Sequence, residues 1–378
     1  MPTDTVSIAR ASLIHEWRRY LAAVLAVTFA GLLVVVQLAL LFGLFATVSV
    51  AVDTSKADLW IGFRNTQSVD LGRTIPAGSD ALAWAHPGVE RIERYSILFG
   101  DLRRADGVPM SVVVNAIDAA PDALAFAQLL SPAERAALRT PGALLIDAAD
   151  TGKLDAEVGS EMEINGKRVR IAGTVEGLRA IGGVNAIVSY ATARALAPDS
   201  ASETTYYLLT VRRGYDPEQV ALELADQRPV ARYSVWHAPR FSAESQIYWL
   251  LESGAGIGSG FASLLALIVG VVIASQTLSG AILASIKEFA ALRALGVSRR
   301  SLRAVVAEQA LWVGVAGLSV TAVLTAVMAW LGETLRIAMQ FPWWMLGGVA
   351  VLMLGIAMLS GLLALRPLLA AEPASLLR

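Results

Sequence analysis

The chain has 378 residues, of which 55% are hydrophobic and 17% are charged, and its formal net charge is −1. A soluble domain carries about 25% charged residues, so this composition predicts an integral membrane protein with a sizeable soluble portion. The near-zero net charge gives no support to nucleic-acid binding. The absence of cysteine excludes disulfides, thiolate metal sites and cysteine nucleophiles.

Four uncharged segments exceed the length of about 20 residues that an α-helix needs to cross a bilayer. They comprise residues 21–48, 254–286, 309–332 and 337–365. Ser49-Val50-Ala51 resembles a weak cleavage site for a signal peptide. The first apolar run is, however, about twice as long as a signal-peptide core, so we interpret it as a retained membrane anchor.

The positions of lysine and arginine predict the orientation in the membrane, because short basic loops stay in the cytoplasm. Arg18 and Arg19 precede the first span, Arg366 follows the fourth, and a basic loop joins the second span to the third. We therefore expect a plasma (inner) membrane protein with both termini in the cytoplasm. The long segment between the first two spans is then extracytoplasmic.

Residues 1–20 are expected to form an interfacial elbow helix that lies on the inner leaflet and leads into the first span. Leu13, Trp17 and Tyr20 recur at the spacing of one helix face. A disordered basic terminus with an aromatic anchor is the alternative. The residues expected to hold the elbow helix at the inner surface are Arg10, Trp17, Arg18 and Arg19.

Residues 57–245 alternate between β-branched runs and short helical patterns, which predicts an α+β domain with two lobes. Asn165-Gly166 is a strong signal for a two-residue hairpin turn. The expected strands are 58–63, 89–104, 108–117, 143–146, 161–175, 186–189 and 205–212, and the expected helices are 80–85, 122–138, 190–196 and 217–226.

Residues 241–252 are less apolar than the second span that follows them. They predict a helix that continues this span outward as a stalk, with Tyr248 and Trp249 at the membrane interface. Glu244 and Glu252 are either solvated stalk charges or ligands for a cationic or metal-bearing substrate.

The second span opens with glycines at four-residue spacing, a pattern that lets two helices approach closely. A flexible hinge at the start of the helix is the alternative. The glycines expected to pack a dimer seam are Gly254, Gly258 and Gly260.

Residues 286–303 form a short charged loop between the second and third spans. Its apolar residues recur every three positions from Ile286 to Leu295, so one face of a short helix can dock on another protein. Gly296 suits the left-handed position that ends a helix, and Ser298 suits the N-cap of the next one. A plain basic loop is the simpler interpretation, but it leaves this apolar face unexplained.

The sequence carries no recognisable catalytic motif. It has no phosphate-binding G-x-x-x-x-G-K-[ST] loop, so any ATP must be hydrolysed by a separate chain. It has no G-x-S-x-G elbow, and His15-Glu16 lacks the second histidine of a zinc protease. His86 and His237 are isolated. We therefore expect this chain to be no enzyme and to hold no cofactor or metal of its own.

The pattern EFAALRALGVS at residues 288–298 closely resembles the coupling loop of ABC transporter permeases of the MacB/FtsX superfamily. Residues 142–177 resemble the small β module of the extracytoplasmic domains in that superfamily, and the ending PASLLR resembles its frequent C-terminal sequence. The opening ASLIHEWRRYLAAVL and the chain length are most similar to DevC-type permeases.

This resemblance implies a homodimer that carries two copies of a separate ATPase, which binds ATP and Mg. ATP binding would move the coupling loops and relay that motion to the outer domain, which is called mechanotransmission, and would export a hydrophobic or amphipathic substrate. A periplasmic adaptor and a TolC-like outer-membrane channel are implied as further partners. The residues implied to engage the ATPase are Glu288, Phe289, Leu292, Arg293, Gly296, Arg299 and Arg300.

The predicted architecture is therefore an integral membrane α-helical protein with four transmembrane helices and an α+β extracytoplasmic domain inserted between helices one and two. The predicted segments are the elbow helix (1–20), the first span (21–50), the outer domain with its stalk (51–253), the second span (254–286), the coupling loop (287–303), the third span (304–332), the fourth span (337–365) and a cytoplasmic tail (366–378).

Three other functions remain open at this point. One is a transporter that extracts a membrane-dissolved molecule such as haem laterally, without a TolC partner. A second is an FtsX-like transducer that activates an extracytoplasmic hydrolase. The third is a membrane-anchored enzyme, which the missing motifs disfavour.

Overall fold

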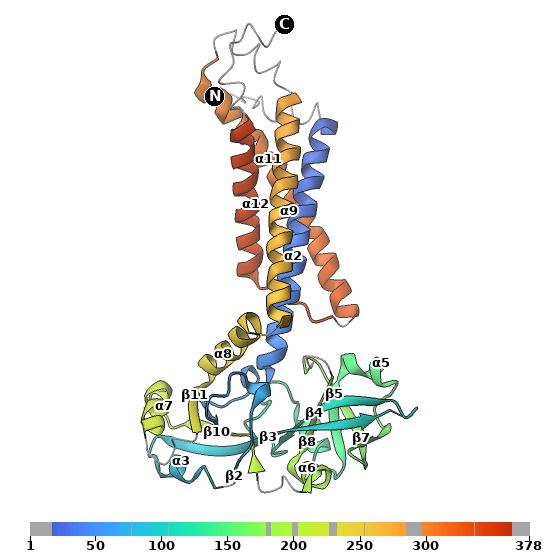
Figure 1. The fold of residues 1–378 in the computed structure, drawn as a ribbon, viewed down its shortest axis with the longest axis vertical. Coiled ribbons are helices and arrows are strands. Elements are labelled where there is room, and N and C mark those ends of the chain that lie inside the picture. Colours follow the sequence, from blue (N-terminus) through green and yellow to red (C-terminus); the bar gives the residue numbers. More distant parts are fainter. Residues whose placement is uncertain are drawn as a thin grey trace, which may run out of the picture. The chain divides into compact units, whose positions relative to one another are not determined.

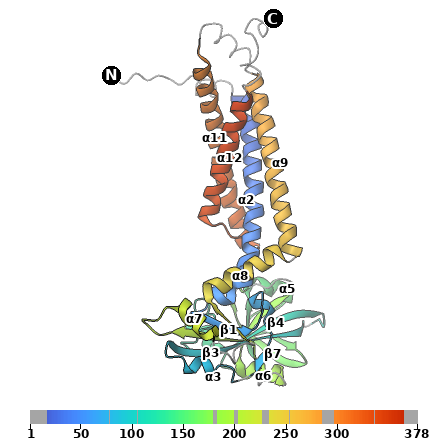
Figure 2. The same cartoon turned by 60° about the vertical axis from the view of Figure 1, so that its left-hand side comes forward.

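The computed structural model describes residues 17–364 except residues 77, 105, 179–182, 199–202, 227–232, 253, 285–296 and 336. The chain divides into two compact units. The helical unit comprises residues 1–43 and 257–378, and the α+β unit comprises residues 44–256. Figures 1 and 2 show long helices in the first unit and a mixed sheet with short helices in the second.

The long helices are α2 (Trp17–Asp53), α9 (Gly254–Ala284), α11 (Arg299–Thr334) and α12 (Trp343–Ala364). Within the described residues, each contains one stretch that is long and apolar enough to cross a membrane. These four stretches correspond to the four predicted spans. The boundaries between the two units fall inside α2 and near the start of α9, and α2 contributes its last ten residues to the α+β unit.

Small residues let α2 and α11 pack closely in the helical unit. The Thr28 hydroxyl donates to the Gly317 carbonyl oxygen over 3.1 Å, and the Thr321 hydroxyl donates to the Thr28 carbonyl oxygen over 3.3 Å. A Cβ atom on Gly317 would lie 2.8 Å from the Val27 side chain. In lipid, close van der Waals packing and such hydrogen bonds hold helices together, because the hydrophobic effect gives no preference for helix–helix contact.

The α+β unit is built on a nine-stranded sheet with the order β11-β1-β10-β3-β4-β8-β5-β7-β6. Its strands are β1 (Leu59–Phe63), β3 (Val89–Arg103), β4 (Pro109–Ile117), β5 (Ala143–Asp147), β6 (Glu161–Ile164), β7 (Lys167–Val175), β8 (Val184–Ser189), β10 (Tyr206–Val211) and β11 (Tyr233–His237), with β2 (Ile75–Pro76) and β9 (Glu203–Thr204) paired separately. The helices are η1 (Val69–Leu71), α3 (Ala81–Ala85), α4 (Pro132–Ala137), η2 (Ala148–Asp150), α5 (Thr151–Leu154), α6 (Tyr190–Leu196), α7 (Pro217–Asp226) and α8 (Ala238–Leu251).

Strand β3 is shared by two lobes. Its first half pairs with β10, its second half pairs with β4, and its last two residues also pair with β6. The strands from β3 through β4, β8, β5 and β7 to β6 therefore close on themselves and surround one hydrophobic core. In the other lobe, α7 lies beside β11 and shares a second core with β1 and β10. This arrangement agrees with the two lobes predicted from the sequence.

The predicted hairpin is present at Asn165-Gly166, which joins β6 to β7. The two residues have φ angles of 51° and 75°, as a tight two-residue turn requires. The sequence reading missed β11, whose five residues YSVWH mix polar and aromatic side chains and do not form a clear strand pattern.

The helix predicted over residues 122–138 is mostly wrong, because only α4 forms there and turns precede it. The Glu93 carboxylate accepts hydrogen bonds from the backbone N–H groups of Leu124, over 2.7 Å, and Ala125, over 3.2 Å. In a helix the Gln128 N–H would donate to the Leu124 carbonyl oxygen, but here it donates to the Thr54 carbonyl oxygen over 2.8 Å. This backbone pairing with a distant segment replaces the hydrogen bonds of the predicted helix.

We expect Gly317→Leu to lower the unfolding temperature of the purified protein, because the new side chain would overlap Val27 of α2. Overpacking of this kind destabilises by about 1–3 kcal/mol. Gly347→Leu on α12 is the matched control, since no described atom lies within 4 Å of a Cβ added there. Equal unfolding temperatures for the two variants in the same detergent would contradict the close α2–α11 contact.

Candidate functional site

Helix α8 is anchored in an aromatic core of the α+β unit. It starts directly after β11, so its first turn enters the core at a fixed point. Phe241 of α8 is fully buried and stacks on Trp236, with 4.5 Å between the ring centroids. Its ring also lies 5.7 Å from the Tyr206 ring and 6.0 Å from the Trp60 ring. Buried aromatic clusters of this kind contribute large apolar area and specific geometry.

Polar contacts join the same face of α8 to the short helix η1. The Ser245 hydroxyl accepts a hydrogen bond from the Val69 backbone N–H over 3.1 Å, and Trp249 Nε1 donates to Asp70 Oδ1 over 3.2 Å. Ser245 is fully buried, so its loss would leave a buried N–H group without a partner. Because Phe241, Ser245 and Trp249 recur every four residues, one face of α8 is held along most of its length.

Helix α8 also contacts the last turns of α2, which belong to the α+β unit. Gln246 Nε2 donates to Ser49 Oγ over 2.9 Å, and Ser49 Oγ donates to Asp53 Oδ2 over 2.6 Å. Ala51 and Val52 of α2 belong to the same hydrophobic core as Phe241. We call residues 44–53 of α2, η1 and α8 together the α2–α8 junction.

The sequence reading did not find this junction. Ser49 lies at the end of a largely apolar segment and Gln246 follows several polar residues of α8, so neither residue gives a distinctive signal in the sequence. They are separated by 197 positions in the chain. Their pairing therefore depends on the fold of the α+β unit and is not encoded in any local pattern.

A cavity of about 260 Å³ lies beside the α2–α8 junction. Its wall is formed by residues from the end of α2, η1, the strands β3, β4 and β8, and Trp249 of α8. Apolar side chains dominate this wall, and a small number of polar groups converge on it. That combination is typical of sites that bind small molecules.

Helices α8 and α9 are separate, which corrects the predicted continuous stalk. α8 ends at Leu251 and α9 begins at Gly254. A Cβ atom on Gly256 would overlap the Trp249 carbonyl oxygen. Glycine is therefore required at this close approach of two backbone segments, and it places a break where the sequence pattern suggested one helix.

Glu244 and Glu252 have partners on the protein surface. Arg240 Nε donates to Glu244 Oε1 over 2.7 Å, and Gln67 Nε2 donates to Glu252 Oε2 over 3.1 Å. The described ranges contain no group of three or more histidine, aspartate and glutamate side chains arranged to hold a metal ion. These contacts favour solvated surface charges over substrate ligands.

Most of the residues assigned to ATPase coupling lie outside the described part of the chain. These are Glu288, Phe289, Leu292, Arg293 and Gly296, and the side chain of Arg299 lies outside it as well. The predicted N-cap is confirmed, because the Ser298 hydroxyl accepts a hydrogen bond from the Ser301 backbone N–H over 3.1 Å at the start of α11.

The first turns of α11 carry an exposed basic face. Arg300 and Arg303 are exposed, whereas Leu302 and Val306 are fully buried. The partial positive charge at a helix N-terminus disfavours cations in the first turn. The helix dipole therefore gives no reason for arginines here, and their exposure is consistent with a role in membrane orientation or in binding a partner.

The elbow residues are described only in part. Arg10 and the side chain of Arg19 lie outside the described residues. Trp17 is 55% exposed at the start of α2, and the Arg18 guanidinium lies over its ring at 5.6 Å from the centroid. Their attachment to a membrane surface stays a prediction.

The glycines of the predicted dimer seam show no close neighbour in this chain. At Gly254, Gly258 and Gly260, no described atom lies within 4 Å of the position that a Cβ would occupy. The open space around them leaves room for another helix. The dimer seam stays a prediction.

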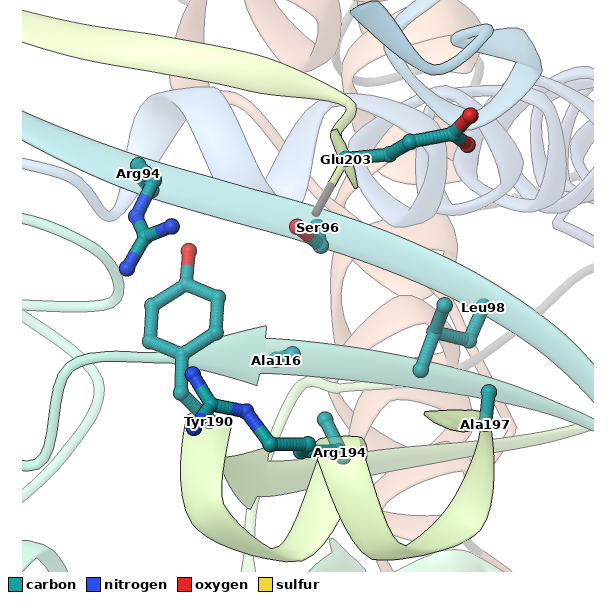
Figure 3. Close-up of a pocket in the computed structure, with 9 residues that line it drawn as sticks. Arg94, Ser96, Leu98, Ala116, Tyr190, Arg194, Ala197 and Glu203 are labelled. Carbon is teal, nitrogen blue, oxygen red and sulfur yellow. The ribbon is translucent and has the colours of Figure 1, made fainter. Parts of the chain in front are cut away.

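A second, smaller cleft lies between β3 and α6 (Figure 3). Figure 3 shows the Tyr190 hydroxyl pointing toward β3, near Arg94 and Ser96. Burial raises the pKa of Tyr190 well above its ordinary value. The cleft holds about 30 Å³, which is room for about one or two water molecules. It is therefore too small to be the main ligand site.

Two family models match the chain. Residues 20–227 match the MacB-like periplasmic core domain, and residues 260–373 match the FtsX-like permease C-terminal domain. The first match alone covers more than half of the chain. This chain belongs to the MacB/FtsX superfamily. It is an ABC-type permease subunit, and its four apolar helices fit a multi-pass membrane protein.

Solved structures similar to the permease share little sequence with it. The periplasmic region of MacB from Actinobacillus actinomycetemcomitans is 11% identical, covers 51% of this chain and 94% of its own, and has a TM-score of 0.37. The extracellular domain of YknZ, a noncanonical ABC-type transporter from Gram-positive bacteria, is 13% identical. This match covers 44% of the permease and 98% of the YknZ domain, with a TM-score of 0.30. A permease domain from Porphyromonas gingivalis is 16% identical. This match covers 48% of the permease chain and 90% of that domain, with a TM-score of 0.33. Comparison with curated proteins gave no match.

We expect Phe241→Ala to destabilise the α+β unit of the permease by about 3–5 kcal/mol, because it leaves a cavity in the aromatic core. The measurement is chemical unfolding of the full-length protein, followed by tryptophan fluorescence. Leu222→Ala is the control, since Leu222 is 66% exposed on α7. An unchanged unfolding midpoint for Phe241→Ala would show that α8 is not anchored through this ring.

Proposed function

We propose that this permease is the membrane subunit of an ABC exporter and couples ATP hydrolysis by a separate ATPase subunit to a conformational change of its α+β unit. The observation that carries the proposal is the α2–α8 junction. α2 contributes to the helical unit and to the α+β unit, and its last turns share one core with α8. A shift of α2 along its axis would therefore be transmitted to the sheet.

The contacts at the junction suit such transmission. The Ser49–Gln246 hydrogen bond ties the end of α2 to α8, and Ser245 and Trp249 tie α8 to η1. Packed, hydrogen-bonded contacts of this kind change between discrete arrangements and do not deform continuously. The α+β unit would then respond to α2 and α8 as one body.

In this proposal the permease works as a homodimer with two copies of the ATPase, which bind ATP and Mg. The predicted coupling loop at residues 287–303 and the exposed arginines at the start of α11 face the ATPase. The seam glycines pack the two copies against each other. The transported molecule is hydrophobic or amphipathic, in keeping with the apolar cavity at the junction.

We propose that the permease is of the DevC type, on the resemblance of its opening residues 11–45 to such permeases. Such an assignment places it in the inner membrane with both termini in the cytoplasm. A periplasmic adaptor and a TolC-like channel would complete the exporter. Two alternatives share its motifs: a lateral extractor of a membrane-dissolved molecule such as haem, and an FtsX-like transducer that activates an extracytoplasmic hydrolase.

We expect Arg293→Glu to leave the permease inserted and dimeric but to uncouple it from ATP hydrolysis, because a reversed charge in the coupling loop would repel the ATPase surface that now accepts an arginine. The measurement is substrate-stimulated ATPase activity and export in reconstituted vesicles. Arg213→Glu makes the same charge change at an exposed position of the α+β unit and is the control. Wild-type export by Arg293→Glu would refute the coupling assignment.

Purification of the tagged permease from its own host under gentle conditions, with mass spectrometry of its partners, separates the alternatives. An ATPase with an adaptor or a TolC-like protein supports the tripartite exporter. An ATPase with a hydrolase favours the transducer, and an ATPase alone favours the lateral extractor. No ATPase, under conditions that keep the permease dimeric, would contradict all three.

A further inference from the structure

The cavity at the α2–α8 junction has an apolar body. Its wall includes Val69, Ile97, Val113 and Phe126, which belong to or pack against the aromatic core. With about 260 Å³, it is smaller than the sites of about 300–1,000 Å³ that hold drug-sized ligands. It therefore suits a small molecule, or the ring or chain of a larger one.

The mouth of the cavity is apolar as well. Phe99 is 65% exposed on β3 and Leu71 is 43% exposed at the end of η1, and both line the cavity. Water-exposed aromatic and aliphatic side chains beside a cavity lose unfavourable hydration when an apolar ligand covers them. This exposure is a reason to expect a ligand with an apolar body.

The neutral polar groups in the wall are largely paired with one another. The Tyr95 hydroxyl donates to Asn115 Oδ1 over 2.5 Å, and Asn115 Nδ2 donates to the Ala186 carbonyl oxygen over 3.2 Å and to Asn185 Oδ1 over 3.3 Å. Burial raises the pKa of Tyr95 well above its ordinary value, so this hydroxyl stays neutral. These groups hold β3, β4 and β8 in register and supply no charge to the cavity.

Among the described residues that line the cavity, Asp70 supplies the one carboxylate, and none of them is a lysine, arginine or histidine. Trp249 Nε1 and the Ser68 hydroxyl donate to its Oδ1 atom. Both contacts orient the carboxylate through one oxygen, so Oδ2 can accept a hydrogen bond from a ligand. A carboxylate beside an apolar wall favours a cation over an anion.

We infer that this cavity binds a small amphipathic cation, with a protonated amine on Asp70 and an apolar ring or chain between Phe99, Val113 and Val69. The inference goes beyond the proposed function, because binding at this site needs neither the ATPase nor transport. Only the further step, in which this cation is the exported substrate, rests on that function.

The test is binding of radiolabelled phenethylammonium to the full-length permease in nanodiscs of phosphatidylglycerol, which carries no amine, with empty nanodiscs as background. Phenethyl alcohol and phenylacetate are the neutral and anionic counterparts of the probe. We expect saturable binding of the cation, weaker binding of the alcohol and no saturable binding of phenylacetate. Phenylacetate that binds as tightly as the cation would overturn the inference, as would no saturable cation binding above background.

Asp70→Asn keeps the shape of the side chain and its hydrogen-bond acceptor but removes the charge. It should weaken cation binding about tenfold or more and leave alcohol binding unchanged. Asp155→Asn removes the same charge at an exposed left-handed residue, a conformation that asparagine tolerates, and should change neither. Equal cation affinity in the wild type and Asp70→Asn would exclude Asp70 as the anchor.

Val113→Phe tests the cavity itself, independently of charge. The larger ring should fill the space and abolish binding of both cation and alcohol. Val108→Phe places the same change at an exposed position just before β4 and should leave binding intact. Undiminished binding in Val113→Phe would place the ligand elsewhere.

Two sources of the amine are separated by replacing half of the phosphatidylglycerol with phosphatidylethanolamine or, at the same surface charge, with phosphatidylcholine. Weaker cation binding in the phosphatidylethanolamine nanodiscs than in the phosphatidylcholine ones would identify a lipid headgroup as the natural occupant, and equal affinity would favour a free amine. ATPase activity of the complex with its partner is measured in parallel on the wild type and on Asp70→Asn. In the wild type, lack of ATPase coupling with saturable cation binding would contradict only the proposed function, and lack of saturable cation binding with intact ATPase coupling would contradict only the ligand site.

Discussion

The stacking of Phe241 on Trp236 is the contact on which the attachment of α8 depends. It seats the first turn of α8 in a core that also contains Trp60, Tyr206 and the end of α2. Once that turn is fixed, Ser245 meets the Val69 backbone and Gln246 meets Ser49. The polar contacts of the junction thus follow from one buried aromatic pair.

The same junction that links α2 to α8 also bounds the apolar cavity, since α2, η1 and Trp249 contribute to both. A change in the position of α2 would therefore alter the cavity wall as well as the sheet. In an exporter, this geometry would let ligand binding and ATP-driven movement influence each other, because each favours a particular arrangement of the same residues. Asp70 lines the cavity and accepts a hydrogen bond from Trp249 of α8, so it would take part both in ligand binding and in the movement of the junction.

The sequence predicted those features that depend on local patterns. Apolar length predicted the four long helices, Asn165-Gly166 predicted its turn, and Ser298 predicted the start of α11. A feature that depends on a distant contact was missed: the backbone of Gln128 pairs with Thr54, and turns form where a helix was predicted. The break in the predicted stalk coincides with the close approach of Gly256 to Trp249, which no sequence pattern indicated. The junction joins positions 49 and 246, so only the fold could place it.

The most direct test of the account is a distance measurement between spin labels on Glu157→Cys in the α+β unit and Glu333→Cys in the helical unit, both exposed. The chain has no cysteine of its own, so only these positions take the label. Labelled chains are diluted with unlabelled ones and bound to the partner ATPase. We expect ATP to shift the distance distribution in the wild type but much less in Gln246→Leu, which lacks the hydrogen bond to Ser49. Identical distributions with and without ATP in the wild type would contradict it.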